Sequence, residues 1–258
     1  MKHEGAFLAV SIFLLGPSSG FSQESGAHPG LYASGISFAG GVGGYSVRDE
    51  YISEETYSGT LPYVEVSWTR FREDRGFKLG LGFRAGGEVR NHTLSSTITG
   101  ASLDLEYFYR AADFTILDRP ATLYLGPSAG FTAYTSDQNI ASNGLDLAIS
   151  FAALMSIGGT SGIIIPVSQR FLFQSALRAD LLSFGLRIVD LVESDESPVK
   201  VLTALNGTDA TARIGFRYDL HRRLSVGVGY EAQVMRISSW DYLGIASDNL
   251  VFSLTFGI

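Results

Sequence analysis

Apolar and polar residues alternate with a period of two along most of the chain, which is the pattern of β-strands. From Phe77 to Val89 the odd-numbered positions are mostly apolar, and the even-numbered positions are glycine or charged. The same alternation recurs in 103–110, 213–220, 224–231 and 250–258. Helical spacing is nearly absent, so the sequence predicts an all-β protein.

The polar face of these strands distinguishes a transmembrane β-barrel from a soluble β-sandwich. It consists largely of Gly, Ser, Arg, Asp and Glu, and lysine occurs only at Lys2, Lys78 and Lys200. Small residues mixed with charges that can pair suit a narrow interior, and the large apolar side chains then face lipid. A closed barrel also leaves no backbone group unpaired in hydrocarbon. We therefore predict a single antiparallel transmembrane β-barrel.

The pattern predicts about ten strands, with eight or twelve as the alternatives. The predicted spans are 31–47, 60–72, 76–91, 95–110, 121–135, 145–165, 170–187, 208–220, 222–236 and 248–258. An even number is usual for bacterial single-chain barrels, and it places both ends of the barrel on the periplasmic side.

The predicted connections differ in length between the two ends of the barrel. Tight periplasmic turns are expected at 73–75, 166–169 and His221, and long outer loops at 48–59, 136–144, 188–207 and 237–247. This asymmetry is typical of outer-membrane barrels. Two links fit less well, because the outer link at 92–94 is short and the periplasmic link at 111–120 is long.

The N-terminus has the three-part layout of a secretory signal peptide. Lys2 supplies the positive charge, 6–15 is largely apolar, and Gly20-Phe21-Ser22 offers small residues before a cleavage site. We expect cleavage after Ser22, which leaves 23–258 as an exported barrel domain. The absence of cysteine excludes a disulfide scaffold and a Cys-ligated metal site, and the net charge of −7 argues against a nucleic-acid partner.

The signal sequence, the strands that alternate glycine with aromatic residues, and the last strand, 250–258, resemble small bacterial outer-membrane barrels. The likeness is to the porin-like barrel-domain families of Bacteroidota-type bacteria. It implies a location in the bacterial outer membrane, contact with the bilayer and lipopolysaccharide, and recognition of the last strand by the barrel-assembly machinery. The expected assembly signal is Phe252, Leu254, Phe256 and Ile258, although such families usually end in an aromatic residue. The oligomeric state stays open.

The alternation also places charged residues of nearly balanced sign inside the barrel. They are Lys78, Arg84, Glu88, Arg90, Asp104, Glu106, Arg110, Arg178, Asp180, Arg213, Arg217, Asp219 and Glu231. Because a buried charge must be paired or hydrated, we expect ion pairs between strands that fill the lumen. In particular, Arg84, Arg213 and Arg217 are expected to pair with Asp104, Glu106 and Glu231.

A second set of charges falls in the predicted outer loops. These acids are Asp49, Glu50, Glu54, Glu55, Glu193, Asp195 and Glu196. They lack the spacing of a known calcium loop, so we read them as solvated carboxylates, with loose divalent binding as the alternative. No resident metal or cofactor is predicted.

Catalytic signatures are weak. His92 lies near Ser95, but Leu94 stands where the His-x-Ser pattern of lipid A deacylase barrels requires serine. The paired acids are not accompanied by the Asp–His pair of outer-membrane aspartyl-type proteases, and the glycine run 39–44 lacks the Lys-Ser/Thr of a phosphate loop. We therefore predict no catalytic residues.

These observations favour a non-enzymatic outer-membrane protein whose lumen is filled by side chains and whose outer loops bind a partner or reinforce the envelope. The alternatives are a narrow pore for small solutes and an outer-membrane enzyme that modifies lipids or peptides.

Overall fold

The computed structural model describes residues 34–50, 53–72, 74–91, 95–139, 148–189 and 197–258. Its strands are β1 (Gly35–Asp49), β2 (Ser53–Phe71), β3 (Arg75–Arg90), β4 (Ser95–Ile116), β5 (Arg119–Asn139), β6 (Ala148–Pro166), β7 (Phe171–Val189), β8 (Val199–Thr203), β9 (Gly207–His221), β10 (Leu224–Ile237) and β11 (Leu243–Gly257). The described residues contain no helix long and apolar enough to cross a membrane.

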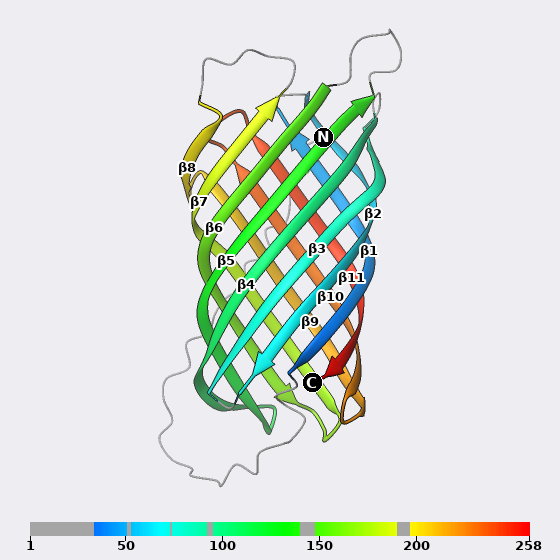
Figure 1. Ribbon diagram of the computed structural model, residues 1–258, viewed down its shortest axis with the longest axis vertical. Coiled ribbons are helices and arrows are strands. Elements are labelled where there is room, and N and C mark those ends of the chain that lie inside the picture. Colours follow the sequence, from blue (N-terminus) through cyan, green and yellow to red (C-terminus); the bar gives the residue numbers. More distant parts are fainter. Residues whose placement is uncertain (1–33, 51–52, 73, 92–94, 140–147, 190–196) are drawn as a thin grey trace.

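All the strands pair with their neighbours in antiparallel fashion and close into a barrel (Figure 1). The barrel closes where β1 pairs with β11 and where β6 pairs with β7. Strand β8 does not add a further strand around the barrel, because β7 pairs with β9 over Phe171–Ala179 and with β8 farther along, over Leu182–Leu186. Counted around its circumference, the barrel therefore has ten strands, and the predicted fold class and strand number are confirmed.

The two ends of the barrel differ in their connections. Gly35 at the start of β1 pairs with Gly257 at the end of β11, so both barrel termini lie at one end. Short links, such as Arg222 and Arg223 between β9 and β10, join strands at that same end. We call it the periplasmic end and the opposite end, which holds Asp49, the outer end.

The strands are longer than a membrane requires. Except for the short β8, they span 14 to 22 residues, whereas a tilted transmembrane strand needs about 9–11. The loops predicted at 48–59 and 237–247 are therefore largely wrong: β2 already begins at Ser53, and β10 and β11 are joined by 238–242. The outer ends of these strands contain serine and threonine, such as Thr56 and Ser58, which is a composition typical of loops. These residues nevertheless keep the strand register.

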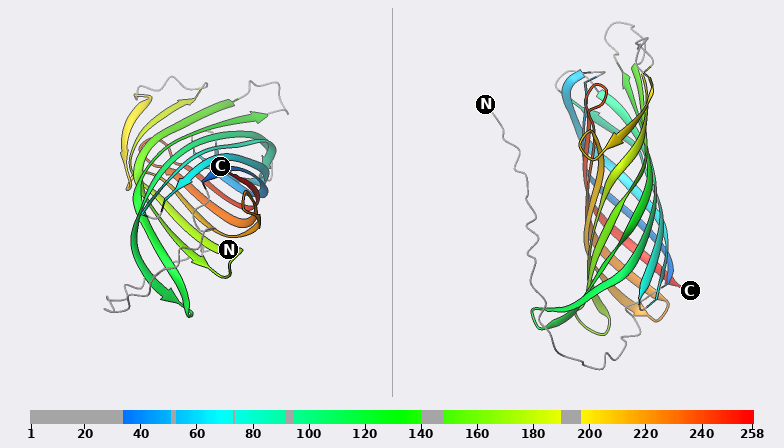
Figure 2. Two further views of the ribbon diagram at one scale, coloured as in Figure 1. Left: turned by 60° about the horizontal axis from the view of Figure 1, so that its bottom comes forward. Right: turned by 90° about the vertical axis from the view of Figure 1, so that its left-hand side faces the viewer.

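The long periplasmic link predicted at 111–120 is also wrong. Strands β4 and β5 continue through it and turn at Leu117 and Asp118, whose φ angles are 47° and 60°. Positive φ at both central residues is typical of a tight type I′ hairpin turn. Figure 2 shows this hairpin projecting away from the barrel wall. The loop predicted at 188–207 likewise contains a strand, β8.

The outward face of the barrel carries a belt of exposed apolar side chains. Leu81, Val228 and Phe252 have 58%, 41% and 59% of their surface exposed, although their inward-facing neighbours are small or charged. A soluble protein does not leave so many large apolar side chains in water, so this surface fits a membrane environment.

Candidate functional site: a lumen filled by side chains

Ion pairs cross the middle of the lumen, and their centre is Arg213 on β9. Its Nε donates to Glu231 on β10 at 2.7 Å, and its other nitrogens lie 3.4 Å from Glu65 on β2 and 3.6 Å from Glu106 on β4. Glu106 also accepts a hydrogen bond from Thr160 at 2.7 Å. One guanidinium thus joins strands from opposite sides of the barrel.

Two further cations from β3 extend this network. Arg84 donates to Glu231 at 3.3 Å and to Gln233 at 3.0 Å, and its guanidinium lies 4.6 Å from the ring centre of Tyr63. Lys78 lies 3.0 Å from Glu65. The pair between Arg84 on β3 and Glu231 on β10 also spans the lumen, so the contacts hold opposite walls together.

A second cluster forms around Arg178 on β7. Its guanidinium pairs with Asp104 on β4 and lies 3.4 Å from Asp180 on its own strand. A methyl group at Gly130 on β5 would overlap this guanidinium, so the bare glycine provides the space for it. All three charged residues are buried.

The outer part of the lumen holds a large apolar cluster. Side chains from most strands meet there and are almost fully buried. They are Tyr45, Val47, Tyr57, Leu61, Val89, Ile98, Tyr134, Ala152, Leu154, Leu202, Met235, Ile237, Leu243 and Ile245, with Trp240 packed against them. Packing these side chains together removes their apolar surface from water.

One more ion pair lies inside the barrel near its outer end. Arg187 on β7 pairs with Asp49 on β1 and donates to the Asp241 carbonyl oxygen at 3.0 Å, while Ser150 donates to Asp49 at 2.9 Å. Asp49 is only 3% exposed. Its prediction as a solvated loop acid is wrong, because β1 continues in register to this residue and turns its side chain inward.

Aromatic rings close the periplasmic end of the lumen. Phe71 stacks on Phe108 at 5.9 Å between ring centres and meets Tyr124 edge-on at 5.9 Å. Phe108 and Tyr124 are 7% and 2% exposed, so both rings are buried within this end of the lumen.

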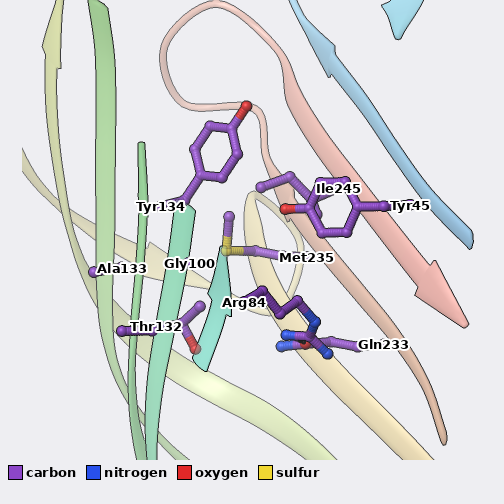
Figure 3. Close-up of a pocket in the computed structure, with 10 residues that line it drawn as sticks. Tyr45, Arg84, Gly100, Thr132, Ala133, Tyr134, Gln233, Met235 and Ile245 are labelled. Carbon is purple, nitrogen blue, oxygen red and sulfur yellow. Dashed lines mark hydrogen bonds between the residues drawn. The ribbon is translucent and has the colours of Figure 1, made fainter. Parts of the chain in front are cut away.

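Two small cavities lie between side chains of the lumen. A cavity between Tyr45, Arg84, Tyr134 and Met235 has a volume of about 20 Å³ (Figure 3), and another beside Glu106 has about 10 Å³. A water molecule needs about 10–15 Å³ measured in this way. The larger of these two cavities therefore has room for one or two water molecules, and the smaller has room for at most one.

Three of the predicted interior charges lie elsewhere. Strand β3 bulges between Arg84 and Gly87, and beyond the bulge Val89 turns inward, so Glu88 and Arg90 face outward and pair with each other. Arg110 lies on the projecting β4–β5 hairpin, where it pairs with Asp113.

Arg217 and Asp219 differ from the prediction in another way. Their ion pair, with 3.2 Å between Arg217 Nε and an Asp219 oxygen, lies along β9 rather than between strands. The other predicted interior charges, namely Lys78, Arg84, Asp104, Glu106, Arg178, Asp180, Arg213 and Glu231, lie in the lumen networks.

Glu65, Asp209 and Arg187 are lumen residues that the prediction missed. Glu65 alternates with the outward Val64 and Val66, so the same period of two could have found it. Asp209 accepts hydrogen bonds from Thr132 at 2.9 Å and from Gln233. Asp209 lies in the predicted span 208–220 and alternates with the same face as Arg213, so the period of two could have found it as well. Arg187 ends the predicted span 170–187, and a register shift between β6 and β7 at Ile157/Gly158 changes which residues of β7 face inward before it.

The predicted outer-loop acids have different surroundings. Glu50 pairs with Arg48 at 2.7 Å, and Glu55 accepts a hydrogen bond from Asn91 at 2.6 Å. Glu54 is part of β2, but its side chain lies outside the described residues, as do Glu193, Asp195 and Glu196.

The candidate catalytic histidine, His92, also lies outside the described residues. His221 ends β9 at the periplasmic end, far along the strand from the outer rim. Within the described ranges, no three His, Cys, Asp or Glu side chains gather as a metal site would require.

The residues predicted as an assembly signal share one face of β11. Phe252, Leu254, Phe256 and Ile258 all point outward and are 59%, 37%, 46% and 81% exposed. Their recognition by the assembly machinery remains a prediction.

No protein-family model and no curated protein matches the chain. Among solved structures, the chain is similar to the outer membrane protease OmpT from Escherichia coli, with a TM-score of 0.53 and 8% identity over 89% of this chain and 97% of that one. It is also similar to the translocator domain of the autotransporter NalP from Neisseria meningitidis, with a TM-score of 0.50 and 11% identity over 89% of each chain. At such low identity the likeness concerns the fold alone. The chain therefore has the fold of outer-membrane β-barrels.

Proposed function

We propose that this protein is a non-enzymatic outer-membrane barrel with a closed lumen, which reinforces the envelope or presents its outer loops to a partner. The observation that supports this proposal most directly is that side chains fill the interior of the barrel. Aromatic rings, cross-lumen ion pairs and an apolar cluster follow one another from the periplasmic to the outer end. The outward apolar belt supports the membrane location.

A solute pore would require a different interior. Open porin channels have about 16 strands, whereas this barrel has ten strands around its circumference, and its interior holds cavities of water size. The ion pairs also bring both signs of charge together, so the lumen lacks the one-sign lining that would select an ion.

The resemblance to porin-like barrel families of Bacteroidota-type bacteria is part of this proposal. It rests on the alternation of glycine with aromatic residues and on the last strand, 250–258. The protease activity named for OmpT is not carried over, because a likeness at 8% identity concerns the fold alone.

Conductance in a planar lipid bilayer tests the closed lumen. We expect the purified full-length barrel to give no stable conductance steps in a bilayer where a trimeric porin, used as the positive control, gives them. Regular steps from the wild-type protein would contradict the proposal and support the pore. Cell fractionation tests the location, since recovery of the exported protein in the soluble periplasm would rule out the barrel's membrane role.

A further inference from the structure

Two arginines lie side by side on the outward face near the outer rim. Arg48 on β1 and Arg236 on β10 both pair in register with Gly244 on β11, which lies between them. Both arginines are exposed. Strands in a sheet are about 4.8 Å apart, so the two backbones are separated by about 10 Å and both side chains project from the same level.

An aromatic ring covers the space between these arginines. A Cβ atom at Gly244 would lie 2.6 Å from the Tyr242 hydroxyl and 2.7 Å from its ring carbon Cε1, so the ring lies directly over the bare glycine. The guanidinium carbons of Arg48 and Arg236 lie 5.7 Å and 5.6 Å from the ring centre. The Glu50 N–H donates to the Tyr242 carbonyl at 2.9 Å and holds the tyrosine's backbone against β1.

The charges of this cluster do not cancel. Arg48 pairs with Glu50 at 2.7 Å, but Arg236 has no carboxylate partner among the described residues. The cluster therefore carries an excess positive charge on a chain whose net charge is −7. By contrast, Arg90, another exposed arginine at the outer rim, is paired with Glu88.

The cluster lies beyond the outer edge of the apolar belt. Arg236 is the next outward residue of β10 after Val234, which is 53% exposed. On β1 the last large apolar outward residue, Val42, precedes Arg48 by three outward positions. In a membrane barrel this level lies at or beyond the headgroups of the outer leaflet, because polar headgroups begin where the hydrocarbon stops.

We propose that Arg48, Arg236 and Tyr242 bind a phosphate group of an outer-leaflet glycolipid. Guanidinium groups bind phosphate oxygens through two parallel, charge-assisted hydrogen bonds, and two of them can hold one phosphate from both sides. The tyrosine fixes both arginines at one level and offers an apolar face beside the phosphate. This inference rests on the outer-membrane location in the proposed function and adds a specific lipid contact to it.

The test measures lipid binding to the purified full-length barrel in detergent by native mass spectrometry. The probes are diphosphorylated lipid A, the same lipid without phosphates, and inorganic phosphate. We expect diphosphorylated lipid A to bind the wild type. The double variant Arg48→Gln/Arg236→Gln should bind it with an affinity lower by about tenfold or by a larger factor. The matched control Arg90→Gln removes an exposed arginine from the same rim and should bind as the wild type does.

The outcomes separate this inference from the proposed function. Equal binding by the double variant, or equal binding of the phosphate-free lipid, would overturn the site while leaving a closed membrane barrel intact. If inorganic phosphate displaces the lipid at comparable concentration, the site recognises a free anion and the lipid assignment fails. Heat-modifiable gel mobility shows whether each variant is folded. If the double variant does not fold, Gly244→Ala, which displaces the ring and keeps both arginines, should reduce binding instead, and unchanged binding would overturn the site.

Discussion

The central arginine of the lumen is surrounded by three carboxylates, and its loss should be costly. Arg213→Met would leave Glu65, Glu106 and Glu231 together without their shared cation. Removing one partner of a buried ionic cluster costs about 3–5 kcal/mol, so we expect the free energy of unfolding to fall by that order. Urea unfolding in lipid vesicles measures it. The matched variant Arg90→Met, at an exposed pair, should change little, and equal effects would show that the lumen network is hydrated.

Two glycines of the lumen should respond differently to a methyl group. At Gly130 the new methyl group would overlap the Arg178 guanidinium, which is held by Asp104, whereas at Gly80 it would lie 3.6 Å from Glu65 Oε1, an ordinary contact. We expect Gly130→Ala to destabilise the barrel by about 1–3 kcal/mol and Gly80→Ala to be nearly neutral. The temperature at which gel mobility changes provides the measurement. If Gly80→Ala were the more harmful variant, the packing around Arg178 would be looser than its contacts indicate.

At the scale of the strand, the bulge in β3 reverses which side chains face the lumen. Beyond Gly87, Val89 is fully buried while Glu88 and Arg90 are exposed. Because the chain contains no cysteine, single-cysteine variants report each position separately. We expect Glu88→Cys and Arg90→Cys to react with a membrane-impermeant maleimide on intact cells, and Val89→Cys to be protected. Labelling of Val89→Cys alone would mean that the alternation continues without a bulge.

The same strand shows what the sequence could predict and what it could not. Alternation located the strands and the inward direction of Arg84, because each strand has one apolar and one polar face. It missed the bulge, because the extra residue is defined by the partner strand β4 and not by β3 alone. It also could not pair Arg213 with Glu65, because that contact depends on which strands face each other across the closed barrel. Segment 111–120 was misread because its charged residues and Pro120 have a loop-like composition.

At the scale of the whole molecule, two separate surfaces stabilise the barrel. The inward surface is held by charges that find partners across the lumen, so it is stable only when the barrel is closed. The outward surface is apolar over its middle and, on β1 and β2, polar near the outer rim, so it is stable only at one depth in a bilayer. Closure and insertion therefore depend on each other, and a charge placed on the outward belt should disrupt both.

Leu81→Arg tests this dependence. Leu81 is 58% exposed on the outward face of β3, and Val228 on β10 is an equivalent position with 41% exposed. Arginine near the bilayer midplane costs roughly 2–4 kcal/mol, so either Leu81→Arg or Val228→Arg should reduce the amount of folded barrel in the outer-membrane fraction. Thr56→Arg places the same charge on the outward face of β2 at the level of Arg48, its partner in register on β1, and it should assemble as the wild type does. Normal assembly of Leu81→Arg would show that this face of β3 does not contact lipid. Equal failure of Thr56→Arg would instead place the outer ends of the strands within the bilayer.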